Sequence, residues 1–209
     1  MMQKYYSLLI LISLFASAAN AQDSSRTHRI TLSGNYVYQV PFHDWYISGL
    51  QVGYGWQNKK MNWHDFDLTG AYAGFKSNSH LVSIGLRYQH TVMPFRRFDN
   101  SRFKPFIGFG AEYSISHSKG EYDNVINRYE TRHFTNSLQP YISPGFEFNF
   151  SKKFYTSLQF PIPLMRLNTV SSRHFDPGIP AGDQSHTHTS LQLLPLQNIQ
   201  ARLTLGYKF

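Results

Sequence analysis

The residues best suited to chemistry are histidines and carboxylates in a polar stretch before the last strand-like segment. The members of this group are His174, Asp176, Asp183, His186 and His188. In an extended strand, the His-Thr-His spacing would aim two imidazoles to one side, as a zinc or copper site requires. Exposed polar loops often carry such residues without a metal, so we assign no metal-ligating residue and no cofactor.

A second group invites a nucleophile and general-base interpretation. His117 and Ser118 are adjacent, and Glu112 and Glu121 lie nearby in the sequence. Adjacent residues of a strand point to opposite faces, so this pair could form a hydrogen bond only in an irregular turn. We therefore assign no catalytic residue. The chain contains no cysteine, which removes thiol catalysis and thiolate metal sites.

Charged residues recur on one side of segments whose other side is apolar. This inner-face set comprises Arg29, Asp65, Asp67, Arg87, Lys104, Glu112, Glu147, Arg202 and Lys208. Desolvated charges need partners, and we expect Glu112 and Glu147 to pair with some of Arg29, Arg87 and Arg202. Two functions remain open for the set: an ion or proton path, and a structural plug of salt bridges.

The elements that position these charges are about eight segments with a strand period of two. They are residues 29–40, 45–57, 64–76, 80–92, 103–115, 138–150, 154–164 and 198–209. The pattern predicts an all-β, antiparallel, up-and-down barrel without a buried helix. Two long outer loops, 117–137 and 165–197, would join the later strands. Pro140, Pro144, Pro161 and Pro163 lack an N–H donor, so we expect bulges or frayed rims there.

Aromatic residues make up 16% of the chain, and many stand near segment ends. Rings with a polar tip suit the two membrane–water interfaces, so they predict interfacial girdles. The residues assigned to them are Tyr38, Trp45, Tyr46, Trp56, Trp63, Tyr88, Tyr113, Tyr141 and Tyr155. Ordinary aromatic packing in a β core is the alternative interpretation.

The two ends of the chain both indicate export. Lys4, an apolar run and a small-x-small site predict a cleaved signal peptide over residues 1–21, which leaves one domain over residues 22–209. From Asn198 the chain alternates apolar and polar residues and stops on Phe209. This segment resembles the C-terminal insertion signal of bacterial outer-membrane β-barrel proteins. The stretch from Lys104 to Gly110 also looks like strands of small outer-membrane barrels.

The chain is thus similar to the family of small, eight-stranded outer-membrane β-barrels of Gram-negative bacteria. The resemblance implies an outer-membrane location, a C-terminal strand read by the barrel-assembly machinery, and contact with outer-membrane lipids and lipopolysaccharide. The net charge of +8 fits such anionic partners, and scattered bases do not indicate nucleic acid binding. We expect a non-enzymatic structural or surface-interaction function with a plugged lumen. The alternatives are a lipid A-modifying barrel enzyme, of the deacylase or acyltransferase type, and a soluble lipocalin-like ligand-binding barrel.

Overall fold

The computed structural model describes eight stretches of the chain, and nearly all of each stretch is β-strand. The described residues are 27–39, 44–58, 62–75, 79–94, 102–123, 128–175, 184–195 and 198–209. The strands are β1 His28–Gln39, β2 Asp44–Gln57, β3 Trp63–Phe75, β4 Ser79–Val92, β5 Phe103–Asp123, β6 Arg128–Asn149, β7 Phe154–Gln159, β8 Ile162–Pro163, β9 Met165–Phe175, β10 Gln184–Leu193 and β11 Asn198–Lys208. Among these residues, no helix is long and apolar enough to cross a membrane. The predicted signal peptide lies outside the described residues.

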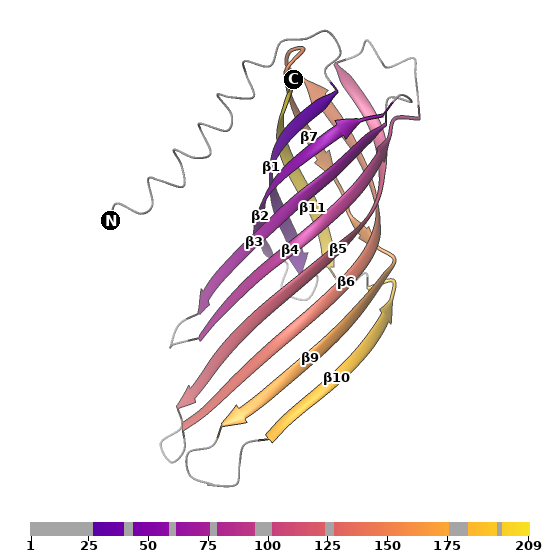
Figure 1. The fold of residues 1–209 in the computed structure, drawn as a ribbon. Helices are drawn as coiled ribbons and strands as arrows, with labels where there is room; N and C mark the ends of the chain where they lie inside the picture. Colours follow the sequence, from indigo (N-terminus) through magenta and orange to yellow (C-terminus); the bar gives the residue numbers. More distant parts are fainter. Residues whose placement is uncertain are drawn as a thin grey trace, which may run out of the picture.

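The strands close into an antiparallel barrel. Strands β1 to β6 pair in sequence order, β6 pairs with β7, β7 pairs with β11, and β11 returns to β1. Because β8 and β9 continue along β6, they and β7 form one stave, so eight staves enclose the lumen (Figure 1). The prediction that the terminal strand pairs with the segment near Arg29 is confirmed, since Arg29 stands opposite Lys208.

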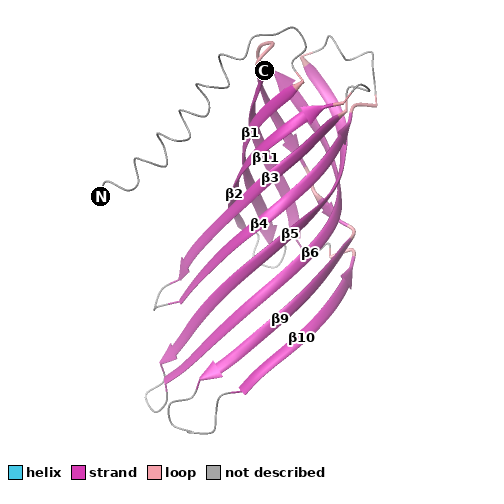
Figure 2. Ribbon diagram, in the orientation of Figure 1, coloured by secondary structure: helices cyan, strands magenta, loops and turns pink. Residues whose placement is uncertain are grey.

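Four strands continue past the shorter hairpins as a sheet in the order β5, β6, β9 and β10 (Figure 2). We call this part, formed by residues 116–123, 128–135, 170–175 and 184–188, the external sheet. The prediction of long loops over 117–137 and 165–197 was therefore wrong for most of their length. Both faces of the external sheet are rich in Ser, Thr, His and charged residues. A strand that faces water on both sides shows no polar–apolar alternation, so its period is invisible in the sequence.

The proline-rich stave is interrupted twice, as predicted. Between β7 and β8 the chain leaves the ladder at Phe160 and Pro161. The register then shifts by one residue, because Tyr141 stands opposite Pro163 whereas Leu138 stands opposite Leu167. The extra residue therefore lies between Pro163 and Leu167, as in a β-bulge.

The barrel is inverted in polarity relative to a soluble protein. On β3, Leu68 is 60% exposed on the outer face while its neighbour Asp67 is 1% exposed in the lumen. The same alternation places apolar side chains outside and polar side chains inside around the barrel. A lipocalin-like barrel would hold its apolar face inward, so this finding rules out the soluble alternative. The apolar exterior is what a lipid environment requires.

Candidate functional site

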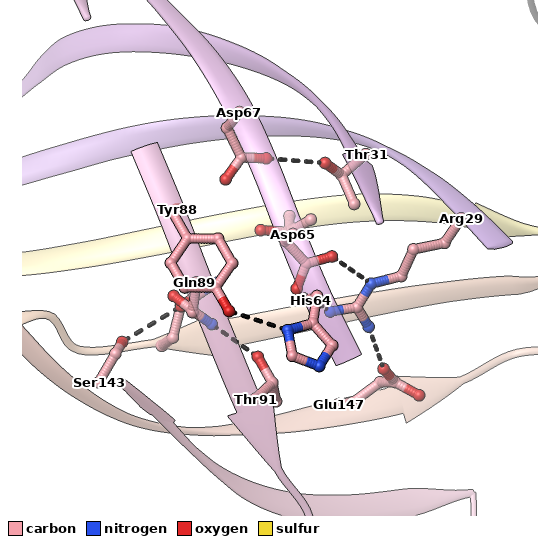
Figure 3. A network of polar contacts seen from close by, with 12 residues as sticks. Arg29, Thr31, His64, Asp65, Asp67, Tyr88, Gln89, Thr91, Ser143 and Glu147 are labelled. Carbon is pink, nitrogen blue, oxygen red and sulfur yellow. Dashed lines mark hydrogen bonds and ion pairs between the residues drawn. The ribbon is translucent and has the colours of Figure 1, made fainter. Parts of the chain in front are cut away.

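The inner-face charges meet in the lumen as two clusters. In the first, near the end of the barrel that holds the C-terminus, Arg29 Nε donates to Asp65 Oδ1 at 2.7 Å and Arg29 Nη2 lies 2.5 Å from Oδ2. Arg29 Nη1 also approaches Glu147 Oε2 at 3.5 Å, and Lys208 Nζ donates to Glu147 Oε1 at 2.5 Å. Figure 3 shows Arg29 reaching between the two carboxylates. Strands β1, β3, β6 and β11 therefore contribute to one network.

Two large aromatic rings cover this cluster from inside the lumen. The Arg29 guanidinium lies 4.3 Å from the ring centroid of Trp63, and Lys208 Nζ lies 4.6 Å from that of Tyr155. Both rings are buried, as is that of Tyr141. The assignment of Trp63, Tyr141 and Tyr155 to membrane girdles was therefore wrong. A narrow lumen needs volume as well as charge to fill it, and aromatic rings supply that volume beside cations.

The second cluster lies deeper along the barrel. Arg87 donates through Nε to Asp67 Oδ2 at 2.7 Å, and its Nη2 also contacts that carboxylate. Thr31 Oγ1 donates to Asp67 Oδ1 at 3.2 Å (Figure 3). Gly53 makes room for this arrangement, because a Cβ there would lie 1.8 Å from Asp67 Oδ1. The small inner-face residues thus permit bulky ion pairs in a narrow barrel.

Toward the external sheet the lumen continues with looser polar contacts. Arg202 donates through Nε to Asn35 Oδ1 at 2.6 Å, and its Nη2 lies 3.7 Å from Glu112 Oε2. Arg166 Nε donates to Gln139 Oε1 at 2.8 Å. The predicted pairings are confirmed, since Glu147 meets Arg29 and Glu112 meets Arg202. The sequence did not indicate that Arg87 would form its ion pair with Asp67.

A cavity of about 20 Å³ lies between the two clusters, and its walls include Arg29, Asp65, Asp67, Arg87 and Glu147. That volume holds about one ordered water. The Tyr155 hydroxyl, which also lines this cavity, has no hydrogen-bond partner among the described residues and would suit such a water. The arrangement can hold opposite charges in place across the barrel.

The candidate nucleophile and base point apart. His117 and Ser118 both lie on β5, where His117 is exposed on the outer face and Ser118 faces inward, opposite His133. The sequence analysis missed a closer pair, since His133 Nδ1 lies 2.9 Å from Ser172 Oγ across β6 and β9. Its members are thirty-nine residues apart, so only strand register brings them together. The side chain of Glu121 lies outside the described residues.

The histidines considered for a metal lie on two strands and not in a loop, with His174 on β9 and both His186 and His188 on β10. His186 and His188 lie on the same face of β10, as the His-Thr-His spacing predicts. The side chains of His174, Asp176 and Asp183 lie outside the described part of the chain. Among the side chains that are described, no three His, Asp or Glu residues form a cluster able to hold a metal ion.

An aromatic and histidine band surrounds the outside of the barrel near the C-terminus. His28 stacks on Tyr54 and on the terminal Phe209, and Trp56 stacks on His64. Rings with polar edges at this height suit a membrane interface. The girdle prediction is therefore supported for Trp56 and Tyr88, which lie on the outer face. The side chains of Tyr38, Trp45 and Tyr46 lie outside the described residues.

Comparison with known proteins gives fold-level similarity only. No family model matches the chain, and no curated protein matches its sequence. The translocator domain of the autotransporter NalP from Neisseria meningitidis is similar over 99% of this chain and 97% of that domain, with 9% identity and a TM-score of 0.52. Neisserial surface protein A matches 90% of this chain and 98% of its own, with 10% identity and a TM-score of 0.43. Ail of Yersinia pestis matches 88% and 97%, with 9% identity and a TM-score of 0.39.

The similarity to the NalP domain agrees with the polarity of the barrel itself. A closed antiparallel barrel with an apolar exterior and a charged lumen is the outer-membrane type of β-barrel. The predicted fold class and the outer-membrane location are confirmed. At these identities the comparisons indicate no ligand and no reaction.

Proposed function

We propose that this protein is a non-conducting outer-membrane barrel that acts at the cell surface through its external sheet. The observation that carries the proposal is the ion-paired lumen. Arg29, Arg87 and Arg202 each meet a carboxylate supplied by a different strand. Paired charges that cross a narrow barrel obstruct it, and the cavity between the two clusters accommodates about one water.

The external sheet supplies a surface for interaction. It carries hydrogen-bonding side chains on both faces, and its last strand, β10, pairs with β9 and ends the strand order of the sheet. Edge strands present N–H and C=O groups that can pair with another chain, and Ser- and Thr-rich faces suit hydrated contacts. These features favour a binding surface over a merely protective loop.

An enzymatic function receives less support. A lipid A-modifying reaction needs a serine, a base and an orienting acid in contact. His133 and Ser172 make the first of these contacts, but among the described side chains no carboxylate is hydrogen-bonded to either of them. We therefore propose a non-enzymatic function for this pair, as a cross-strand contact that stabilises the external sheet.

Conductance measurements test the obstructed lumen. The purified chain in planar lipid bilayers should give no discrete current steps. The Asp65→Ala variant removes the main partner of Arg29 and so weakens the ion pairs that cross the lumen. Leu205→Ala, on the lipid face, is its control. Regular conductance steps from the unaltered protein would show that its lumen is open. That result would contradict the proposal.

Shortening the external sheet tests the surface function. His117, Phe134, Ser171 and Thr187 form one continuous row across four strands. Replacing residues 118–133 and 172–186 each with Asn-Gly closes both hairpins just beyond this row. The shortened barrel should keep its heat-modifiable mobility on gels but lose cell aggregation and attachment to surfaces. Equal aggregation and attachment by cells carrying either form would refute a surface function.

A further inference from the structure

Two histidines stand directly opposite each other on the outer face of the barrel, near the end that holds the C-terminus. In the register, His64 of β3 faces His90 of β4. Their ring centroids are 4.5 Å apart, and the ring planes are inclined at 43°. Both side chains point outward, because the next residue of β3, Asp65, is buried in the lumen and successive side chains alternate. We call these two residues the histidine pair.

The hydrogen bonds around His64 define which of its ring nitrogens carries the proton. The Asn58 amide is oriented by the backbone, since its Oδ1 accepts a hydrogen bond from the Asn62 N–H at 3.0 Å. Asn58 Nδ2 therefore donates to His64 Nε2, which lies 3.3 Å away, so Nε2 has no proton and presents a lone pair. His64 Nδ1 then carries the proton and donates to the Tyr88 hydroxyl at 2.8 Å (Figure 3).

Metal-binding histidines use the same arrangement. A histidine that ligates a metal through one ring nitrogen donates a hydrogen bond from the other, which fixes the orientation of the ring. At His64 the Tyr88 hydroxyl accepts that bond, and Trp56 stacks on the same ring at a centroid distance of 5.4 Å. The contact from Asn58 Nδ2 to His64 Nε2 is long for a hydrogen bond, so a metal ion can replace it at small cost.

His90 is positioned to supply a second nitrogen. Its Nδ1 is buried and has no hydrogen-bond partner among the described residues, so no hydrogen bond at that nitrogen opposes a rotation of the ring. Directly opposite side chains of an antiparallel pair have Cβ atoms about 4.5–5.5 Å apart. Two imidazoles at that separation can meet one metal ion, which lies about 2.0–2.1 Å from each ligating nitrogen.

We propose that the histidine pair binds one divalent transition-metal ion, with copper(II) bound most tightly. Imidazole nitrogen suits copper, zinc and nickel, and copper(II) has the highest affinity of these ions for a given set of ligands. Two imidazoles are fewer protein ligands than a structural zinc site uses, so water completes the coordination sphere. Both histidines are only partly buried, which leaves the metal accessible to water. The pair lies at the opposite end of the barrel from the external sheet, so the metal site is independent of the surface function proposed above (Figure 1).

The test is an isothermal titration with Cu²⁺ of the purified chain, without an added histidine tag, in detergent micelles. One ion should bind per barrel. His64→Gln and His90→Gln should each lower the affinity at least about tenfold, because each removes one of the two ligating nitrogens. The matched control is His80→Gln/His117→Gln, which removes another histidine pair on adjacent strands, with rings 6.2 Å apart. The control should keep its affinity within about twofold of the unaltered protein.

Electron paramagnetic resonance of the bound Cu²⁺ identifies the ligands. The unaltered protein should show coupling to two imidazole nitrogens, and each single variant should show coupling to at most one. Tyr88→Phe removes the acceptor for the His64 Nδ1 proton but no ligand. This variant should lower the affinity about tenfold and keep the coupling to both nitrogens, as expected of a positioning residue.

Three results would overturn the site. The first is unchanged affinity in both single variants. The second is coupling to fewer than two nitrogens in the unaltered protein. The third is a loss of affinity in the control, or in His186→Gln/His188→Gln of β10, as large as that in the single variants, which would place the copper elsewhere. Heat-modifiable mobility checks that each variant is folded, and the spectrum of the unaltered protein decides the matter if a single variant fails to assemble.

Discussion

The buried pair of Asp67 and Arg87 allows the clearest test of how the lumen is stabilised. Asp67 accepts hydrogen bonds from Arg87 and from the Thr31 hydroxyl, and both ionised side chains are almost completely buried. Asp67→Asn keeps the shape of the side chain but removes its charge. Arg87 would then lose its ionised hydrogen-bond partner and keep neutral ones, among them Gln89 Oε1, to which its Nη1 donates at 3.1 Å.

The expected cost follows from this geometry. Removing one member of a buried ion pair leaves the other charge uncompensated, which costs about 3–5 kcal/mol of the free energy of unfolding. Arg87→Gln should cost a similar amount, because Asp67 would keep only Thr31 as a hydrogen-bond donor. The double variant Asp67→Asn/Arg87→Gln removes both charges and should therefore cost well below the sum of the singles. The coupling free energy should reach about 2 kcal/mol or more.

Urea unfolding of the chain in lipid vesicles, followed by tryptophan fluorescence, measures these differences. Trp63 in the lumen provides a probe that becomes solvated on unfolding. Glu130→Gln on the external sheet is a matched control, since it breaks an exposed pair with Arg132 and should change the free energy of unfolding far less than the lumen variants do. If Asp67→Asn costs no more than this control, or if the two lumen variants are additive, the charges are not held as a desolvated pair.

Three other outcomes are expected. Leu203→Arg, on the lipid face of β11, should cost about 2–4 kcal/mol of barrel stability if it lies near mid-membrane, and full recovery of heat-resistant barrel would contradict that position. Gly53→Ala should cost about 1–3 kcal/mol of the free energy of unfolding in the same urea assay, because its Cβ would displace Asp67. Gly70→Ala is the control and should be nearly neutral, since no atom lies within 4 Å of the added Cβ. Equal effects of the two variants would refute the clash. Deletion of Phe209 should reduce the amount of assembled barrel in the outer membrane, since this residue pairs through its backbone with His28 and ends the proposed assembly signal; normal surface delivery would exclude that function.

The alternating pattern was informative wherever the two faces of a strand meet different surroundings. Strands β1 to β4 lie within a residue of their predicted ranges, and the pairing of the terminal strand with β1 was anticipated. The pattern failed over the external sheet, where both faces of each strand are polar and so no longer contrast. It also misplaced Trp63 and Tyr155, because an aromatic ring near a strand end suits either an interface or a crowded lumen.

The sequence by itself determined the period of the strands, the polarity of their two faces and hence the membrane in which the chain can fold. Which charges pair was decided only by the tertiary structure. Arg29 and Asp65 are thirty-six residues apart, and His133 and Ser172 thirty-nine. Such contacts depend on the register of neighbouring strands and on closure of the barrel, and a shift of one residue would turn each side chain to the opposite face. Lys119, Arg132 and Arg173 likewise become neighbours only because three strands align them.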